Sequence, residues 1–158
     1  MEAIHVKNPD WLMVNVGEHI DRFAHDMAMP GINGPSLYAH FARVVQFGND
    51  HEEFWVVLDG KEPVGFANWN TLGLPHIGKV YAGFLHCWDK TGQATNLLHD
   101  HYLAFGERHN ATWYVYEASS KAHVRLLDRE LKKRGYNLHE TGFVNCISRK
   151  TNDARGPA

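Results

Sequence analysis

Residues 88–101, WDKTGQATNLLHDH, form the segment whose residue types and spacing best suit a chemical task. An apolar run typical of a strand is followed there by a charged pair, a glycine, small residues and a helical pattern. Gly92 removes a side chain from the bend and Ala94 keeps the next turn slim, so a ligand can approach the backbone. Unpaired N–H groups of a first helical turn, at the positive end of the helix dipole, bind phosphates. The segment therefore predicts a pyrophosphate-binding bend, although a lone glycine also fits an ordinary strand-to-helix turn.

The elements that must position this bend follow from the hydrophobic periodicity of the chain. The first third is mostly helical, paired strands follow, and the rest runs strand, helix, strand, helix, strand. The expected elements are a strand at 2–8, helices at 14–27 and 35–48, a hairpin at 52–72, a strand at 78–88, a helix at 93–110, a strand at 112–118, a helix at 121–135 and one or two strands at 136–150.

These elements predict the fold class. Asp59-Gly60, a two-residue turn that matches the twist of paired strands, joins the two halves of the hairpin. The strand–helix–strand unit at 79–117 is expected to be a right-handed crossover with parallel strands. The prediction is an α/β (α+β) fold with a mixed, mostly antiparallel twisted sheet of six to seven strands and helices on both faces. One domain is expected over residues 1–148, with a polar tail at 149–158.

Composition narrows the classes of partner. The chain has 158 residues, a formal net charge of −2, 44% hydrophobic residues and 22% charged residues, which is ordinary for one globular domain. We therefore expect no nucleic acid and no membrane as a partner. Cys87 and Cys146 both lie in apolar, strand-like runs, and the N-terminus lacks the features of a signal peptide. A reducing, cytoplasmic location is predicted.

The chain contains 12 histidines, so a metal site has to be considered. His99 and His101 are two residues apart on a predicted helix, so their side chains point to different faces. The other histidines show no HxxxH or HExxH spacing and no cysteine at ligand distance. No metal site is expected.

The bend also carries a family resemblance. From Gly92 onward, DKTGQATNLL resembles the acetyl-coenzyme A loop of the GCN5-related N-acetyltransferases (GNAT family), which reads Gln/Arg-x-x-Gly-x-Gly/Ala and precedes a Leu-Leu pair. Ala94 takes the second small position, Leu97-Leu98 follows, and Trp88 stands for the aromatic residue that often precedes the loop. The resemblance implies a GNAT-like acyl-CoA N-acyltransferase fold.

A second motif of the same family lies downstream. YEASSKAHVRLLDRELKKRGY resembles a strand and helix that run to Gly-Phe, with Gly135-Tyr136 at that position, and the whole resemblance spans residues 52–147. It implies acetyl-CoA as a co-substrate and a primary amine as the acceptor. The cofactor-binding residues that it implies are Phe84, Leu85, His86, Lys90, Thr91, Gly92, Gln93, Ala94, Thr95 and Ser120.

The resemblance also implies a mechanism. The amine attacks the thioester directly, so the protein removes an ammonium proton, polarises the carbonyl through a backbone N–H near residues 84–86, and protonates the thiolate. His86 and Glu117, at the ends of successive strands, are candidate bases. Ser120 and His123 are candidate groups near the thiol. Glu117 also fits an ordinary strand-end carboxylate, and His123 a solvated helix residue.

Three departures from the family pattern bear on this mechanism. Asp89 takes the place of the Gln or Arg that begins the loop, and two like charges at ~5 Å cost roughly 3 kcal/mol unless the carboxylate points away. Lys90 can offset part of this repulsion. Ser120 stands where Asn is usual, and Leu127 or Leu131 stands where many members carry the tyrosine that protonates the thiolate.

Three functions follow from these observations, and the third, a histidine-rich metal-binding module, comes last because the chain lacks ligand spacing. The first is an N-acetyltransferase that acts on a primary amine of a small molecule or a protein, with a homodimer or a protein partner left open. The second is a catalytically degenerate GNAT-like binding or structural protein. Residues 120–127, SKAHVRLL, resemble Asn-x-x-His-Ile-Arg-Phe-Leu in small GNAT-like proteins of tailed bacteriophages. That resemblance implies a virion or host-takeover component, located in the host cytoplasm or the virion.

Overall fold

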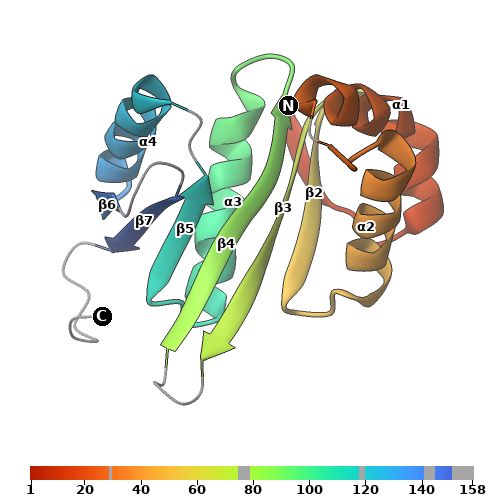
Figure 1. The fold of residues 1–158 in the computed structure, drawn as a ribbon. Helices are drawn as coiled ribbons and strands as arrows, with labels where there is room; N and C mark the ends of the chain where they lie inside the picture. The colour runs from red at the N-terminus through yellow and green to blue at the C-terminus, as the bar shows by residue number, and fades with distance from the viewer. Residues whose placement is uncertain (29, 75–78, 118–119, 141–144, 151–158) are drawn as a thin grey trace. The chain divides into compact units, whose positions relative to one another are not determined.

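The computed structural model of this protein describes residues 1–28, 30–74, 79–117, 120–140 and 145–150. Helices and strands occur in the order expected from the sequence (Figure 1). The elements are β1 (Glu2–His5), α1 (Pro9–Met27), α2 (Gly34–Phe47), β2 (Glu52–Asp59), β3 (Glu62–Leu74), β4 (Lys79–Asp89), α3 (Ala94–Arg108), β5 (Trp113–Glu117), α4 (Lys121–Lys133), β6 (Tyr136–Glu140) and β7 (Asn145–Lys150).

The strands form one seven-stranded sheet in the order β1-β2-β3-β4-β5-β7-β6. β1 pairs with β2 antiparallel, β5 and β6 each pair with β7 antiparallel, and β4 pairs with β5 in parallel. The parallel pair is the one joined through α3, as the crossover rule requires. The predicted mixed, mostly antiparallel sheet and the parallel strand–helix–strand unit are confirmed.

The chain divides into two compact units. The first unit comprises Met1–Trp69 and His86–His101, and the second comprises Asn70–Leu85 and Tyr102–Ala158. Strands β3 and β4 and helix α3 each contribute residues to both units. A single domain over residues 1–148 stays a prediction.

Helix α1 begins five residues before the helix expected at 14–27. The Asn8 side chain accepts hydrogen bonds from the backbone N–H groups of Asp10 and Trp11, and Pro9 occupies the first turn. A capping Asn followed by Pro is a strong helix start, because it satisfies orphan donors and presets φ. The helix ends at Ala28, which adopts a left-handed φ of 48°.

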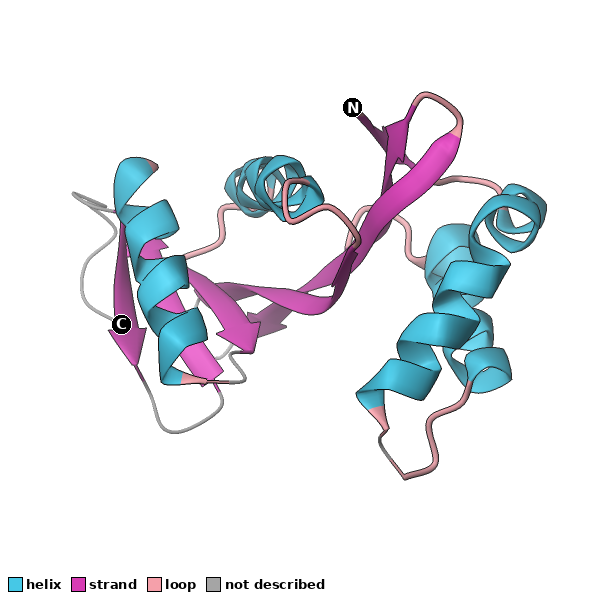
Figure 2. Cartoon of the chain, turned by 90° about the horizontal axis from the view of Figure 1, so that it is seen from above, coloured by secondary structure: helices cyan, strands magenta, loops and turns pink. Residues whose placement is uncertain are grey.

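Both faces of the sheet in the first unit are covered by helices, as predicted. Phe54 and Val56 of β2 belong to the core that α1 and α2 build with each other (Figure 2). The intervening Trp55 points to the opposite face, where it stacks on His101 of α3 with ring centroids 4.1 Å apart. The hairpin turn closes at Gly60, whose φ of +62° explains the glycine.

The second unit is organised around tyrosines. Tyr102 of α3 and Tyr136 of β6 both pack edge-to-face on Tyr114 of β5, with ring centroids 5.7 and 5.1 Å away. A side chain at Gly106 would lie 2.2 Å from the Tyr114 ring, so the glycine permits this close approach. These aromatic contacts fix α3 against the parallel β4–β5 pair.

Candidate functional site

The bend between β4 and α3 is occupied by the carboxylate of Asp89. Its Oδ1 atom accepts hydrogen bonds from the backbone N–H groups of Thr91 (2.9 Å) and Gly92 (2.8 Å) and from the Thr91 hydroxyl (3.1 Å). Its Oδ2 atom accepts from the Thr95 N–H and hydroxyl, both at 2.8 Å. The loop therefore binds an anion, and that anion is its own side chain.

This arrangement stabilises the charged form of Asp89. Burial alone would raise the pKa of the carboxyl, but the hydrogen bonds from Thr95, Thr91 and Gly92 outweigh it and lower that pKa below its usual value. Gly92 has a φ of +73° with open space around its Cα, so the backbone conformation itself requires glycine. The backbone N–H of Gln93 donates to the Thr91 hydroxyl at 3.1 Å.

Ala94 packs closely against the sheet, and its predicted contact with a cofactor stays a prediction. Its side chain is fully buried. A Cβ on Gly65 of β3 would lie 2.5 Å from the Ala94 Cβ, so two small residues let α3 begin directly against the sheet. Leu98 is also fully buried, whereas Leu97 is half-buried.

The neighbouring cation and thiol are also engaged. The Lys90 ammonium forms an ion pair with Glu62 of β3, and its backbone N–H donates to the Val64 carbonyl oxygen at 2.9 Å. The Cys87 Sγ atom lies 3.7 Å from the Thr95 hydroxyl, and burial raises the pKa of this thiol to about 11. Cys87 is therefore protonated at neutral pH and is not a nucleophile.

His86 of β4 is held by Asn68 of β3. The Asn68 amide oxygen accepts from the His86 backbone N–H at 3.1 Å and lies 2.8 Å from its ring Nδ1 atom. Because an amide oxygen only accepts, Nδ1 carries the hydrogen and Nε2 carries the lone pair in the neutral ring. The backbone N–H of His86, one of the donors predicted to polarise a carbonyl, is thus already in use.

The surroundings of His86 keep its imidazole neutral. Phe23 of α1 and Phe41 of α2 both meet the ring edge-to-face, at centroid distances of 6.4 and 5.4 Å. Burial, with a smaller repulsion from His40 of α2, lowers the pKa of His86 to about 4. At neutral pH the ring is therefore a positioned proton acceptor.

The predicted site residues of the second unit are described separately. Phe84 is half-buried against Tyr102, with ring centroids 5.1 Å apart, and Leu85 is exposed. The register of β4 with β5 runs from Tyr81 opposite Trp113 to Gly83 opposite Val115.

Tyr102 of α3 marks the end of that register. Its fully buried hydroxyl donates to the Ala82 carbonyl oxygen at 2.8 Å and to the Val115 carbonyl oxygen at 3.2 Å. Burial raises the pKa of this phenol well above its usual value. Tyr102 therefore ties the two strands together through α3, and its buried hydroxyl is unsuited to acid catalysis.

The remaining predicted residues lie at the end of β5 and the start of α4. Glu117 is exposed and sits opposite Asn145 of β7. Ser120 is the N-cap of α4, and its hydroxyl accepts from the backbone N–H of His123 at 3.1 Å. His123 is exposed. The catalytic roles assigned to Glu117, Ser120 and His123 stay predictions.

Sequence reasoning did not identify Asn68 and His40. Asn68 is 18 residues from His86 in the chain, so only the register of β3 against β4 brings them together. His40 lies on α2, and its ring centroid is 5.7 Å from that of His86. A polar residue at a core-facing position of a predicted strand was the only available signal for Asn68.

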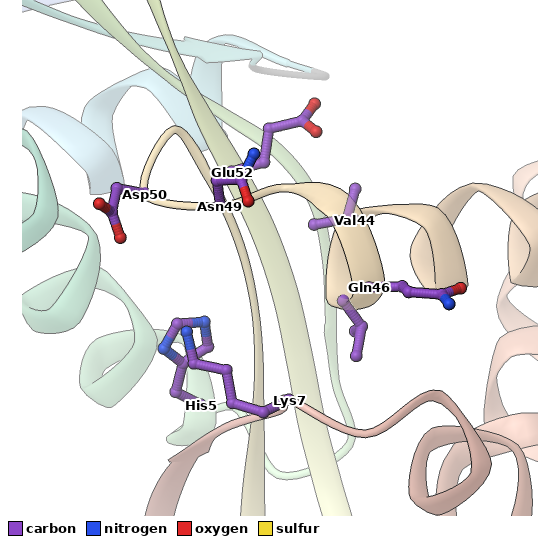
Figure 3. Close-up of a pocket in the computed structure, with 8 residues that line it drawn as sticks. His5, Lys7, Val44, Gln46, Asn49, Asp50 and Glu52 are labelled. Carbon is purple, nitrogen blue, oxygen red and sulfur yellow. The ribbon is translucent and has the colours of Figure 1, made fainter.

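A separate hollow of about 290 Å³ lies in the first unit between β1, the end of α2 and the start of β2 (Figure 3). Figure 3 shows Gln46 and Glu52 directed away from the space that His5 and Lys7 border. Glu52 is engaged by Arg43 in a two-pronged ion pair of 2.9 and 3.1 Å. None of the predicted site residues lines this hollow.

Two kinds of feature are absent from the described residues. Within them, no three His, Cys, Asp or Glu side chains converge as metal ligands. Among the helices drawn in Figure 1, none combines the length and the apolar character needed to cross a lipid bilayer.

Solved structures share this fold. An acetyltransferase from Streptococcus agalactiae superposes with a TM-score of 0.65 at 14% identity, covering 95% of this chain and 97% of its own. A GNAT-family acetyltransferase from Streptococcus pneumoniae gives 0.60 at 9% identity, with coverages of 93% and 97%. A predicted acetyltransferase with acetyl-CoA from Clostridium acetobutylicum gives 0.61 at 14% identity, with coverages of 90% and 93%.

The sequence itself matches no family model and no curated protein. The structural likeness covers nearly the whole chain at very low identity, so it defines the fold. This chain has the fold of the GCN5-related N-acetyltransferases, and the GNAT-like fold predicted from the bend and the downstream motif is confirmed.

Proposed function

We propose that this protein is an N-acetyltransferase that moves an acetyl group from acetyl-CoA to a primary amine by direct attack. The observation that carries the proposal is the Asn68–His86 pair, which presents a neutral imidazole with its lone pair on Nε2. The contact holds this half-buried histidine in the one tautomer that leaves Nε2 able to accept a proton, as a general base requires. The fold shared with solved acetyltransferases supports the same reading.

In the proposed reaction a C–N bond replaces a C–S bond, and one proton leaves the amine. The amine nitrogen attacks the thioester carbonyl carbon, and a C–N bond forms as the C–S bond breaks. The ammonium proton passes to His86 Nε2, whose pKa of about 4 keeps it unprotonated beforehand. The leaving thiolate takes up one proton, for which Ser120 and His123 stay candidates.

Acetyl-CoA binding in this proposal requires a rearrangement of Asp89. A diphosphate can reach the N–H groups of Thr91, Gly92 and Thr95 only after the carboxylate has left them. Asp89 is half-buried, so water partly screens its carboxylate, and its displacement is expected to weaken binding by about tenfold to a hundredfold, or 1.4–2.8 kcal/mol.

The five hydrogen bonds to Asp89 also favour a second function. A loop that has replaced its ligand with its own side chain suits a GNAT-fold protein that no longer transfers acetyl groups and instead binds another protein. The bacteriophage origin suggested by residues 120–127 stays a prediction within this alternative.

Calorimetric titration of the full chain with acetyl-CoA, and with desulfo-CoA, separates the two functions. Acetyltransferase function predicts saturable binding of both that Gly92→Glu abolishes. Gly60→Glu is the matched control, because both glycines have positive φ and open space around them. No binding heat at millimolar acetyl-CoA would overturn the acetyltransferase proposal and leave the binding protein.

A further inference from the structure

His40 of α2 has no role in the reaction proposed above, yet one of its ring nitrogens is buried. Its Nε2 atom is shielded from solvent and has no hydrogen-bond partner in the part of the chain that the structure describes. An unpaired buried polar atom costs about 1–3 kcal/mol, so such atoms indicate a bound water, an ion or a catalytic role.

The two imidazoles of His40 and His86 are neighbours in an aromatic setting. Their planes are inclined by 61°, and Phe41 meets both rings, at centroid distances of 5.6 Å from His40 and 5.4 Å from His86. Among the described atoms no direct hydrogen bond joins the two rings. A water between them is the simplest connection, because it would satisfy the orphaned nitrogen.

His86 needs such a connection in order to work as a base. Asn68 already holds Nδ1–H, so a proton can be gained only at Nε2. That gain creates a new N–H donor and a positive charge beside Phe23 and Phe41, which supply no hydrogen-bond acceptor. A general base is most effective when its pKa is near the working pH, and the pKa of His86, about 4, lies well below neutral pH.

We propose that His40 is a positioning residue for the base, and that its Nε2 lone pair accepts, through one water, the hydrogen bond of the N–H formed on His86 Nε2. The ammonium N–H bond breaks as its proton passes to this water, an O–H bond of the water breaks as that proton passes to His86 Nε2, and His40 stays neutral. The reaction step rests on the proposed function. The support of a protonated His86 by a neutral His40 is a property of the chain alone.

The charges around the pair are compatible with a neutral His40. Burial lowers the pKa of His40, the Arg43 guanidinium on the same helix lowers it further, and Glu52 at the start of β2 opposes them. For His86 the one charge effect is repulsion from a protonated His40. The two imidazoles therefore support each other only in the pH range where His40 carries no proton.

Side-chain NMR titration of the full chain tests this support without any ligand. In His40→Phe, loss of the acceptor is expected to lower the pKa of His86 by about half a unit to one unit. His40→Gln keeps an acceptor and should restore the wild-type value, and His40→Leu is the second variant if Phe disturbs folding. His25→Phe, at a position 90% exposed, is the control.

The opposite sign would overturn the inference. If His40 acts on His86 only as a repelling charge, its removal raises the pKa of His86 or leaves it unchanged. In the acetylation assay, His40→Phe should lower kcat about tenfold with unchanged KM for the amine, and move the acid limb of the kcat profile to lower pH. Absence of acetyl-CoA binding in wild type would defeat the proposed function alone, because the titration still decides the role of His40.

Discussion

The contact between Asn68 and His86 lies near the end of β4, and the loop at Asp89–Thr95 follows directly. The two regions differ in whether their polar groups already have partners within the chain. In the loop, the backbone donors that suit a diphosphate are consumed by an internal carboxylate. At the strand contact, Asn68 satisfies Nδ1 and leaves Nε2 with a lone pair. The loop donors are therefore engaged, whereas His86 keeps one ring nitrogen with a lone pair, so the two regions can be tested separately.

The largest expected effect is on catalysis. His86→Phe keeps an aromatic ring among Phe23 and Phe41 but removes the proton acceptor, and loss of a general base lowers the rate by about 10²–10⁴-fold. Release of thiol from acetyl-CoA in the presence of a primary amine measures this rate.

The matched control is His19→Phe, at the half-buried ring that stacks on Trp88 with centroids 4.7 Å apart. Acetyl-CoA affinity should be the same in wild type, His86→Phe and His19→Phe. Equal transfer rates in His86→Phe and His19→Phe would show that His86 is not the base.

The next effect is on acetyl-CoA affinity and concerns the closed region. Asp89→Ala frees the N–H groups of Gly92 and Thr95, so acetyl-CoA should bind about tenfold to a hundredfold more tightly, and Asp89→Arg more tightly again. Asp10→Ala, which removes an acidic residue from the first turn of α1, is the control for net charge. An unchanged dissociation constant in Asp89→Ala would mean that the carboxylate does not compete with the diphosphate.

A smaller effect is expected on stability at the open region. Asn68→Ala leaves two donors of His86 without an acceptor in a buried setting, which costs about 1–3 kcal/mol of unfolding free energy. Urea denaturation measures the change, with Asn70→Ala on the same strand as the control. Equal losses in the two variants would show that the contact adds nothing specific to β3.

The smallest expected effect is the loss of stability on acidification, which occurs in a different pH range for His86 than for Asp89. The folded-state pKa of His86, about 4, lies below the ordinary value of 6.5. As the pH falls from 6.5 to 4, the unfolded chain gains a proton on His86 while the folded chain does not, so the free energy of unfolding falls. With allowance for partial exposure, this removes about 1–2 kcal/mol. The pKa of Asp89 is lowered from its ordinary value of 3.8, so the stability that its charged form contributes is lost only as the pH falls below about 3.8.

The difference between wild type and His86→Phe in urea isolates the first of these pH windows, because His19 and His40 also have lowered pKa values and act in the same direction. The two stability curves should converge as pH falls from 6.5 to 4. Parallel curves over that interval would contradict the assignment of a depressed pKa to His86.

Local signals in the sequence were sufficient for most of the fold. The Asp59-Gly60 turn, the helical spacing after Gly92 and the strand–helix–strand order each depend on neighbouring residues, and the hairpin and the parallel β4–β5 pair followed from them. The predicted start of α1 is wrong because it rests on apolar spacing alone, whereas the Asn8-Pro9 capping pattern sets where the helix begins.

The candidate site was harder to predict because its contacts join distant segments. Asn68 meets His86 through strand register, and His40 reaches it through helix packing, so neither follows from spacing. Asp89 was different, because an Asp that bonds N–H groups two and three residues ahead is a local turn pattern. The family resemblance drew attention to its charge, whereas the hydroxyls of Thr91 and Thr95 decide its orientation.

The most direct test of this account is the ring tautomer of His86, read from long-range proton–nitrogen NMR spectra of the full chain at neutral pH. The account predicts a neutral ring with the hydrogen on Nδ1 and a lone pair on Nε2. A ring with the hydrogen on Nε2, or one charged at neutral pH, would contradict it, because Nε2 would then have no lone pair with which to accept a proton.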